Sequence, residues 1–534
     1  MKRITTKIIV IIISVITIVY TIYNIYISKE RKKDNQEIIE TKEKIIANDM
    51  RVGIINFDNI NPILSNNVNI QNVSRLIFEP LINLSSDYRL EPCLATEWTK
   101  SDKNTYLIKL RENIEWQDGK KFDSSDVLFT VNMIKSLKNN SIYYSNVKNI
   151  KTITKIDEYT IKIITDKEVS YFEYNLIFPI MSSKYFNENN FTLDNKNINP
   201  PGTGMYYISD NKNSEMVLKK NTSWWEEKEL KLDIINLKLY NNLNSALEDI
   251  KTNNLDLISS SLTTIDKYLK GVQCNKIKYE GRNYDYISMN CNDNILKDKN
   301  VRQAISYLIN KDEIISEVYN NKYIKSDFPL DFGNYLYSEN SSKINYDTDK
   351  AKELLKKAGW KYKNEKWTKK ENNQYIVLSL EILVNKNDKN RERVSELIKN
   401  QLEKIGIKVS INKKETKSFE KSINEGKYEL ALTGNTYSFA PMLDTYFMSG
   451  NIANYNNKYI IDKIKKIQNN DNEEENKILL SNIIEEYNND VPYISLYYNS
   501  STLIYSNNLK GDIKPNSYNI FNNIETWYRE YDKN

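Results

Sequence analysis

The chain has 534 residues, of which 40% are hydrophobic and 28% are charged, and this length predicts two or three lobes instead of one simple core. The net charge is only +5, without a dominant basic block, which argues against nucleic acid as a partner. Histidine is absent, so the usual general base, the commonest metal ligand and every Ser-His-Asp or Cys-His arrangement are excluded.

The N-terminal segment is the first predicted element. Residues 8–27 carry no charged side chain and follow Lys2, Arg3 and Lys7. A helix of this length crosses a hydrocarbon core of about 30 Å. We therefore expect residues 1–28 to be a membrane anchor or signal. An uncleaved anchor is favoured, because the apolar stretch exceeds that of a secretory signal and only Ser28 is small at its end.

The residues that flank this segment leave its orientation open. Lys29 and Arg31 to Lys33 rival the basic residues that precede the apolar stretch. No cysteine lies nearby, which excludes a lipid anchor through an N-terminal cysteine. Residues 29–48 are charged and poor in apolar side chains, so we expect a short stalk.

The next predicted elements lie between residues 105 and 164. Alternating apolar residues from Tyr106 to Leu110 predict a strand, and the Asp118-Gly119 turn that follows favours a hairpin. Ser124 or Ser125 offers an N-cap for a helix with apolar residues at helical spacing. A second alternating strand is predicted over 159–164.

A longer alternation of helices and strands follows in the C-terminal half. Asp347 or Thr348 can cap a helix that Gly359 ends. Strands are predicted over 375–383, 407–411 and 428–432, with a helix over 394–405 and a short helix near Phe419. This order predicts an α/β lobe with crossover connections. Because no long linker is present, we expect the sheet strands themselves to join the lobes.

A series of motifs runs in order from about Asn61 to Tyr498. The most specific is LRENIEWQDG at 110–119, followed by Phe122 and the helix opening at 125–127. Before it stand LIFEPLI at 76–82 and EPCLATEW at 91–98. After it come PGTGMY at 201–206, NTSWW at 221–225, VRQAI at 301–305, Tyr346-Asp347 with 351–359, and LEKIGI at 402–407.

In order and spacing, these motifs resemble the large extracellular solute-binding proteins for dipeptides, oligopeptides and nickel, which are the receptor components of ABC importers. The resemblance implies an α/β, three-lobe periplasmic-binding-protein-like fold with a hinged inter-lobe ligand cleft, to which the N-terminal transmembrane helix is added. Lobe I is then discontinuous, over 49–82, 203–292 and 490–534. Lobe II covers 83–202 and lobe III covers 293–489, and the ligand lies between lobes I and III.

The resemblance also gives candidate ligand-binding positions, because such proteins commonly bind an extended peptide as an added strand. Relatives that bind peptides often carry an aspartate that pairs with the α-ammonium group of the ligand. Here Ser438 stands closest to that position, and Asp444 lies too far along. A ligand without a free amine, or another carboxylate as its partner, therefore stays open. The candidates are Asn66, Asn67, Val68, Tyr143, Gly434, Asn435, Thr436, Tyr437, Ser438, Tyr497 and Tyr498.

No metal or cofactor is expected. The three cysteines, Cys93, Cys274 and Cys291, form no C-x-x-C pair, and a single bridge between Cys274 and Cys291 stays open. Nickel is disfavoured because imidazole is its usual protein donor, although a ligand that itself carries histidine escapes this argument.

Three other motifs have structural interpretations. The Asp118-Gly119 turn and the strand before Arg111 are explained by turn chemistry. Gly202-Thr203-Gly204 lacks the remaining residues of a nucleotide-binding loop, which favours a hinge or bulge. Trp224-Trp225 is expected to be a buried aromatic pair instead of a sugar-stacking surface.

The sequence thus predicts a non-enzymatic, extracytoplasmic binding protein on the cell membrane. Its expected partners are a peptide or peptide-like ligand, the permease and ATPase subunits of an ABC importer, and the membrane through residues 8–27; we expect a monomer. One alternative is a surface receptor for signalling or scaffolding. Another is a membrane-tethered serine hydrolase, because S-x-x-K occurs at 145–148 and 418–421, but no K-T-G accompanies it.

Overall fold

The computed structural model describes residues 17–27, 44–212 and 214–532. The chain divides into two compact units, Met1–Ala47 with Glu530–Asn534, and Asn48–Arg529. In the first unit, residues 17–27 are helical and strand β1 (Lys44–Ala47) lies beside β23 (Tyr528–Asp532). Lys44 forms an ion pair there with Glu530.

The expected transmembrane helix falls only partly on the described residues. Residues 8–16 lie outside them, as do residues 29–43 of the expected stalk. Within the described ranges, none of the helices combines the length and the apolar character needed to span a bilayer.

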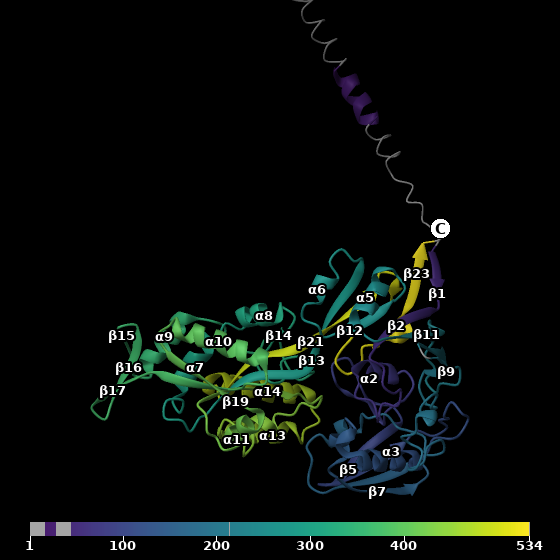
Figure 1. Ribbon diagram of the computed structural model, residues 1–534, viewed down its shortest axis with the longest axis horizontal. Coiled ribbons are helices and arrows are strands. Elements are labelled where there is room, and N and C mark those ends of the chain that lie inside the picture. Colours follow the sequence, from purple (N-terminus) through teal and green to yellow (C-terminus); the bar gives the residue numbers. More distant parts are fainter. Residues whose placement is uncertain (1–16, 28–43, 213, 533–534) are drawn as a thin grey trace, which may run out of the picture. The chain divides into compact units, whose positions relative to one another are not determined.

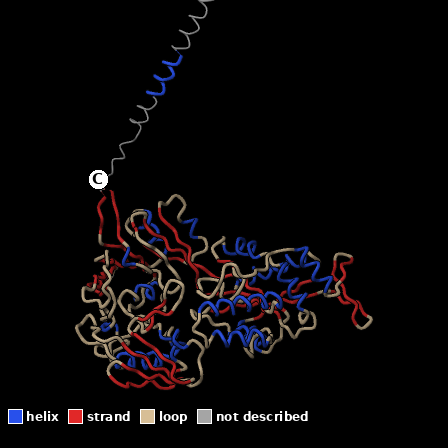
Figure 2. The backbone as a smooth tube through the Cα atoms, turned by 180° about the vertical axis from the view of Figure 1, so that it is seen from behind, coloured by secondary structure: helices blue, strands red, loops and turns tan. Residues whose placement is uncertain are grey.

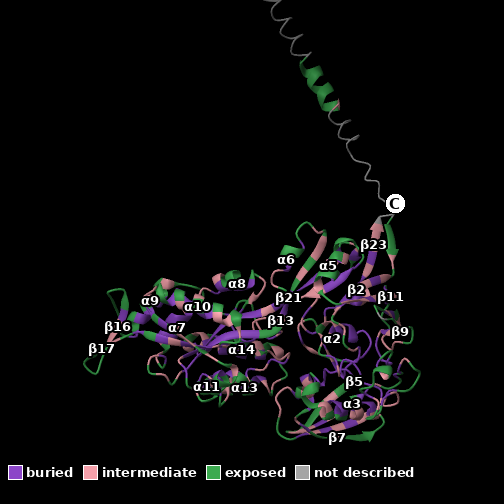
Figure 3. Ribbon diagram, viewed as in Figure 1, coloured by how far each residue is buried: buried purple, intermediate pink, exposed green. Residues whose placement is uncertain are grey.

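The second unit is built around a mixed sheet of 11 strands (Figure 1). Their order is β19-β18-β20-β13-β21-β12-β2-β11-β10-β9, and β14 pairs with β21 outside this path. Buried residues follow these strands and the helix faces turned toward them (Figure 3). The strands are β2 (Asp49–Ile55), β9 (Tyr206–Lys212), β10 (Glu215–Lys220), β11 (Ile234–Tyr240), β12 (Leu257–Ser260), β13 (Cys274–Met289), β14 (Ile324–Lys325), β18 (Ser379–Asn385), β19 (Lys408–Lys414), β20 (Leu430–Thr436) and β21 (Tyr493–Ser506).

Two long antiparallel strands, β13 and β21, connect the two ends of this sheet. Both halves of β13 pair with β21, whose C-terminal end also pairs with β12. The second half of β13 pairs on its other side with β20. The register between β13 and β21 shifts between Glu280 and Tyr284, and again between Asp285 and Tyr286. Such irregularities bend a strand and re-aim its side chains, so the pair changes course in the middle of the sheet.

The C-terminal part has the predicted crossover topology. Strand β18 pairs in parallel with both β19 and β20, and helices α10 and α11 provide the connections. Figure 2 shows, from behind, the helices that cover these strands. The helices of this part are α7 (Lys299–Leu308), α8 (Lys311–Tyr319), α9 (Thr348–Lys357), α10 (Lys389–Glu403), α11 (Thr416–Asn424), α12 (Asp444–Phe447), α13 (Lys458–Ile467) and α14 (Glu473–Asp490).

The N-terminal part adds a second sheet and several short elements. Strands β5 (Ala95–Asp102), β6 (Thr105–Leu110), β8 (Thr160–Thr165) and β7 (Ile150–Asp157) form a sheet in that order, against which α3 (Ser124–Leu137) packs. The remaining elements are α2 (Val68–Ser74), α4 (Tyr144–Val147), α5 (Leu243–Lys251), α6 (Ile265–Tyr268), β3 (Ile82–Leu84), β4 (Leu90–Pro92), β15 (Lys361–Lys363), β16 (Lys366–Glu371), β17 (Gln374–Val377) and β22 (Leu509–Lys510).

The predicted hairpin around Asp118-Gly119 is wrong as a strand pairing. Strand β6 pairs with β5 and β8, and the turn itself closes with one isolated bridge between Glu115 and Lys121. Asn113 has a φ of 62°, which turns the chain away from the direction of β6. The turn therefore pairs only the residues beside it, and β6 finds its strand partners in β5 and β8.

The N-cap of α3 is Asp123 and not Ser124 or Ser125. Its carboxylate accepts a hydrogen bond from the backbone N–H of Ser125 at 2.7 Å, and Asp126 accepts from the N–H of Asp123 at 3.0 Å. This reciprocal capping box satisfies the free N–H groups of the first turn.

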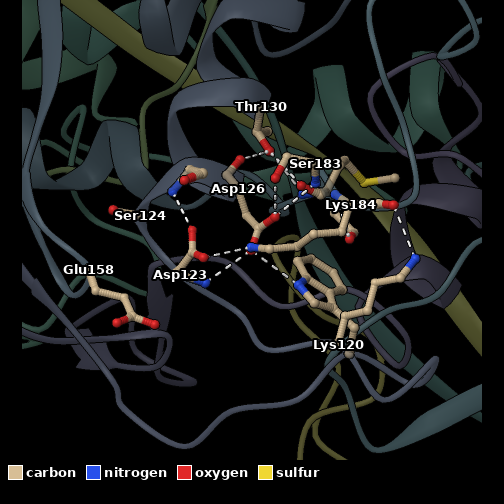
Figure 4. A network of polar contacts seen from close by, with 12 residues as sticks. Lys120, Asp123, Ser124, Asp126, Thr130, Glu158, Ser183 and Lys184 are labelled. Atoms are coloured by element: carbon tan, nitrogen blue, oxygen red, sulfur yellow. Dashed lines mark hydrogen bonds and ion pairs between the residues drawn. The ribbon is translucent and has the colours of Figure 1, made fainter.

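Asp126 also joins the most specific motif to the loop at residues 183–184 (Figure 4). The fully buried carboxylate accepts hydrogen bonds from Trp116 Nε1 at 3.2 Å and from Ser183 N at 2.8 Å, and pairs with Lys184 Nζ at 2.8 Å. A buried carboxylate with so many partners is stabilised in place. We therefore assign this network to structure and not to ligand binding.

The glycines of the 201–206 motif permit close backbone contact with residues 76–77. The N–H of Gly204 donates to the carbonyl of Ile77 at 2.9 Å. A Cβ atom at Gly202 would lie 1.8 Å from that same carbonyl oxygen. Only glycine fits at this approach.

Candidate functional site

A cavity of about 690 Å³ lies beside the irregular stretch of β13 and β21, and we call it the central cleft. Segments far apart in the sequence line it, which is typical of a ligand site between parts of a fold. They include α2 with Arg75, residues 142–146, the end of β12, and residues 279–282, 436–439, 499–501 and 516–520.

The walls of the central cleft are mainly amides and hydroxyls. Such groups can donate to and accept from a peptide-like ligand without carrying charge themselves. The charged side chains among the lining residues are Arg75, Glu280 and Arg282. The amides are Gln71, Asn69, Asn72, Asn146, Asn175, Asn499 and Asn516.

Of the candidates Asn66, Asn67 and Val68, one has a structural role and one lines the cleft. Asn67 caps α2, and its amide also donates to the carbonyls of Ile55 and Asn56 at 2.8 and 2.7 Å. Val68 is 69% exposed and lines the cleft. Asn66 is exposed but is not among the lining residues. The side chain of Asn67 therefore holds the helix that presents Val68.

Tyr143, another of the sequence candidates, lies at the wall of the central cleft. Its hydroxyl donates to Gln71 Oε1 at 2.6 Å, and Gln71 Nε2 in turn donates to the carbonyls of Pro62 and Ser65. Burial raises the pKa of Tyr143, so the hydroxyl stays protonated. This chain of hydrogen bonds fixes the phenol ring as part of the wall.

The predicted segment 434–438 lies across two cavities. Thr436 and Ser438 line the central cleft, whereas Gly434, Asn435 and Thr436 line a neighbouring cavity of about 300 Å³ that contains the Asp285–Arg391 ion pair. The guanidinium and carboxylate of that pair are 2.7 Å apart.

Tyr437 and Ser438 also border a narrow pocket beside the central cleft. The backbone N–H of Tyr437 donates to the carbonyl of Arg282, while its hydroxyl is buried without a hydrogen-bond partner. Ser438 Oγ accepts from the N–H of Ala440 at 3.2 Å. Ser438 therefore supplies a neutral hydroxyl at this wall.

Tyr497 and Tyr498 are core residues. The hydroxyl of Tyr497 lies 3.0 Å from that of Tyr319, and Tyr498 donates to the carbonyl of Pro329 at 2.6 Å. Tyr498 borders only the narrow pocket, and Tyr497 lines none of the cavities described here. The next part of β21 supplies the lining instead, through Asn499 and Ser501.

Three charged residues of the central cleft were not among the sequence candidates. Arg75 ends α2 and lies over the ring of Tyr518, with Cζ 3.6 Å from the ring centroid. Arg282 Nε donates to the carbonyl of Tyr437 at 2.9 Å. An isolated arginine or glutamate within a Lys- and Glu-rich sequence carries no local signal that it faces a cleft.

Glu280 is the carboxylate of the central cleft. It is 8% exposed, and burial raises its pKa to about 7. The backbone N–H of Ser517 donates to it at 3.5 Å. Glu280 therefore titrates close to neutral pH.

Trp224 and Trp225 are half-buried and not fully buried as the sequence predicted, but their contacts are structural. Their indole N–H groups donate to the two oxygens of Glu79 at 2.9 and 2.8 Å. Burial raises the pKa of Glu79 to about 7, while these hydrogen bonds oppose the rise.

The described residues offer no group of three or more Cys, Asp or Glu side chains arranged to hold a metal ion. Cys93, Cys274 and Cys291 are free, so the bridge between Cys274 and Cys291 is not formed.

Known proteins resemble this chain in sequence and in fold. The di/tripeptide-binding protein 1 of Pseudomonas aeruginosa is 26% identical over 368 residues, which cover 64% of this chain and 67% of that protein. The oligopeptide-binding protein AppA of Bacillus subtilis is 23% identical over 449 residues, covering 79% and 80%. The structure of HbpA2 from Haemophilus parasuis matches with a TM-score of 0.74 at 20% identity, covering 91% of this chain and 100% of that one.

A family model also matches the chain over a long continuous stretch. It covers residues 89–457, which include the 110–119 motif, α3 and the strands from β13 to β20. The family model describes the middle region of the bacterial extracellular solute-binding proteins, family 5. The chain belongs to this family.

Proposed function

We propose that this protein is the extracytoplasmic substrate-binding component of an ABC importer that captures oligopeptides in the central cleft and delivers them to a permease. The central cleft carries this proposal, because it lies where β13 and β21 change register and is lined by neutral amides and hydroxyls. Two relatives named for binding di-, tri- or oligopeptides support the ligand class.

The edge of β20 supports binding of an extended chain. Its parallel pairing with β18 ends at Ala431, whereas its pairing with β13 continues to Thr436. The backbone from Leu432 to Thr436 can therefore add a strand on the side away from β13. Main-chain hydrogen bonds of this kind would make recognition largely independent of the peptide sequence.

Glu280 is the group that we assign to a ligand ammonium, in place of the aspartate that Ser438 replaces. It borders both the central cleft and the narrow pocket that contains Ser438. An ammonium group beside this buried carboxylate would favour its ionised form and form a charge-assisted hydrogen bond.

The arrangement of the whole chain belongs to the same proposal. The lobes are I (49–82, 203–292 and 490–534), II (83–202) and III (293–489), with β13 and β21 as the crossing strands. Residues 8–27 anchor the protein to the membrane, its partners are the permease and ATPase, and it acts as a non-enzymatic monomer. The family, one of extracellular solute-binding proteins, supports an extracytoplasmic body.

Titration with pools of random di- to pentapeptides tests the ligand class. Calorimetry and thermal unfolding should show saturable binding and a raised unfolding temperature, because a ligand that binds only the folded state stabilises it. Free amino acids and oligosaccharides serve as controls. Absence of a response to every peptide pool, or an equal response to the oligosaccharides, would contradict the proposal.

A further inference from the structure

Two arginines reach the central cleft from different elements. Arg75 follows the last turn of α2, and Arg282 lies on β13 within the register shift. Each is held by an aromatic ring, Tyr518 under Arg75 at 3.6 Å and Phe439 under Arg282 at 4.3 Å. Stacking of this kind orients a guanidinium group and leaves its N–H groups available at the edge.

Neither guanidinium is neutralised by the protein. Within 44–212 and 214–532, Arg75 and Arg282 form no salt bridge, and Nε of Arg75 is buried without a hydrogen-bond partner. Arg391, by contrast, pairs with Asp285 at 2.7 Å in the neighbouring cavity. Both guanidinium groups therefore lack a carboxylate partner among these residues, whereas that of Arg391 has one.

The two positive charges affect the pKa of Tyr143 in the cleft wall, and the charge of Arg75 affects the pKa of Arg282. Burial raises the pKa of Tyr143, and the guanidinium groups of both Arg75 and Arg282 oppose this rise. The surrounding protein and the charge of Arg75 lower the pKa of Arg282 to about 10, although its side chain keeps an exposed surface in the cleft. Two like charges thus act on one region of the central cleft.

The remaining charge of the cleft does not offset this pair. Glu280 is the carboxylate among the lining residues, and it accepts a hydrogen bond from the backbone N–H of Ser517. With its pKa at about 7, it is partly protonated at neutral pH. The cleft therefore presents two guanidinium groups against at most one negative charge.

We propose that Arg75 and Arg282 form a subsite for a carboxylate of the ligand, so that the preferred peptides present an acidic group beside Tyr143. This inference rests on the proposed function and specifies its ligand. The planar guanidinium matches a carboxylate with paired N–H···O hydrogen bonds. The carboxylate is either the C-terminus of the peptide or an Asp or Glu side chain, because both present the same chemistry.

Four matched pools of random pentapeptides separate the two sources. The pools combine a C-terminal acid or amide with one internal residue that is either Glu or Gln, and calorimetry measures each dissociation constant. Removal of the recognised carboxylate is expected to weaken binding at least about tenfold, the effect of losing a charged hydrogen-bond partner. A loss in the amide pools identifies the C-terminus, and a loss in the Gln pools identifies the side chain.

Substitutions assign the effect to the two arginines. Arg282→Met and Arg75→Met are expected to remove most of the preference for the acidic pool, whereas Arg282→Lys retains part of it through its charge. Arg393→Met, at an exposed position of α10, is the matched control and should bind as the unaltered protein does. Circular dichroism and thermal unfolding check that each variant is folded.

The outcomes distinguish this inference from the proposed function. Equal affinity for all four pools in the unaltered protein overturns the carboxylate subsite while peptide binding stands. An unchanged acid preference in both methionine variants overturns the assignment to Arg75 and Arg282. Absence of binding to any pool overturns the peptide function itself. The pool comparison requires no substitution, so misfolding of a variant cannot conceal the answer.

Discussion

Glu280 is a carboxylate whose protonation is set by burial, and this links ligand affinity to pH. With a pKa of about 7, raised by burial, the side chain is mostly neutral at pH 6 and mostly ionised at pH 7.5. Only the ionised form attracts an ammonium group. Affinity for peptides with a free amine should therefore fall as the pH falls through 7.

This prediction concerns the apparent dissociation constant of a free-amine peptide pool. Because the apparent affinity scales with the ionised fraction of Glu280, binding should be about eightfold tighter at pH 7.5 than at pH 6. Calorimetry at both pH values measures the ratio. The Glu280→Gln variant and an N-acetylated pool are the controls, and both should lack the pH dependence. A similar pH dependence with the acetylated pool would contradict the assignment of Glu280 to the ligand amine.

Some of the sequence candidates line the cleft that we propose as the ligand site, and others do not. Val68, Tyr143, Thr436 and Ser438 line the central cleft, whereas Tyr497 lies in the core. The position of a segment within the family pattern predicts that the segment lies near the cleft. Which of its side chains face the cleft depends on the strands with which it pairs. In β21 these partners are β12, β13 and β14, which leave little of the strand free.

At the scale of elements, local signals predicted the strand and helix order well. Asp347 caps α9, Gly359 follows that helix with a φ of 87°, and the strands and helices from β18 to β20 appear in the predicted order. These features depend on neighbours in sequence. The turn at Asp118 closes locally through a bridge between Glu115 and Lys121, but the partners of β6 are β5 and the distant β8. Long-range pairing of this kind leaves no mark in a local pattern.

The contact between the 201–206 motif and residues 76–77 gives a prediction about stability. Substitution Gly202→Ala would place Cβ 1.8 Å from the Ile77 carbonyl oxygen, so the two segments must separate. We expect the free energy of unfolding to fall by about 3 kcal/mol or more, since overpacking of a rigid contact costs about 1–3 kcal/mol and a backbone hydrogen bond is also lost. Urea denaturation monitored by circular dichroism measures the change.

A second glycine provides the control for this substitution. Gly450 has a φ of 84°, and a Cβ atom there would meet nothing within 4 Å. Gly450→Ala should therefore cost only about 1 kcal/mol, the price of the left-handed backbone conformation alone. Equal losses for the two variants would show that the close approach of Gly202 to Ile77 contributes nothing specific.

At the scale of the whole second unit, a set of contacts joins two regions that are distant in sequence, and we call it the clasp. Arg89 donates to both oxygens of Glu473 at 2.7 and 3.3 Å and lies over the ring of Tyr335. Ser170 donates to Asp444 at 3.2 Å. These contacts border a cavity of about 790 Å³, separate from the central cleft. The clasp therefore connects the region of β5 to β8 with that of α12 to α14.

The clasp bears on closure because β13 and β21 are the strands that cross between the halves of the large sheet. We propose that these strands bend to open the central cleft; the clasp would then break on opening, and its ion pair would stabilise the closed conformation. Arg89 and Glu473 are each about one-third to two-fifths exposed, at 41% and 35%, so the stabilisation is modest. Arg89→Met should thus weaken peptide binding about two- to fivefold, mainly through faster dissociation.

Stopped-flow dissociation and small-angle scattering measure this effect on closure. The expected result is a faster release of peptide and a larger radius of gyration for the ligand-free Arg89→Met variant. Lys100→Met breaks a similarly exposed ion pair with Glu168 beside the sheet of β5 to β8, and should leave both quantities unchanged. High salt should reproduce part of the Arg89→Met effect in the unaltered protein, because it screens exposed charges. Identical behaviour of the two variants would assign the clasp to local stability, and closure would then depend on the bending of β13 and β21 alone.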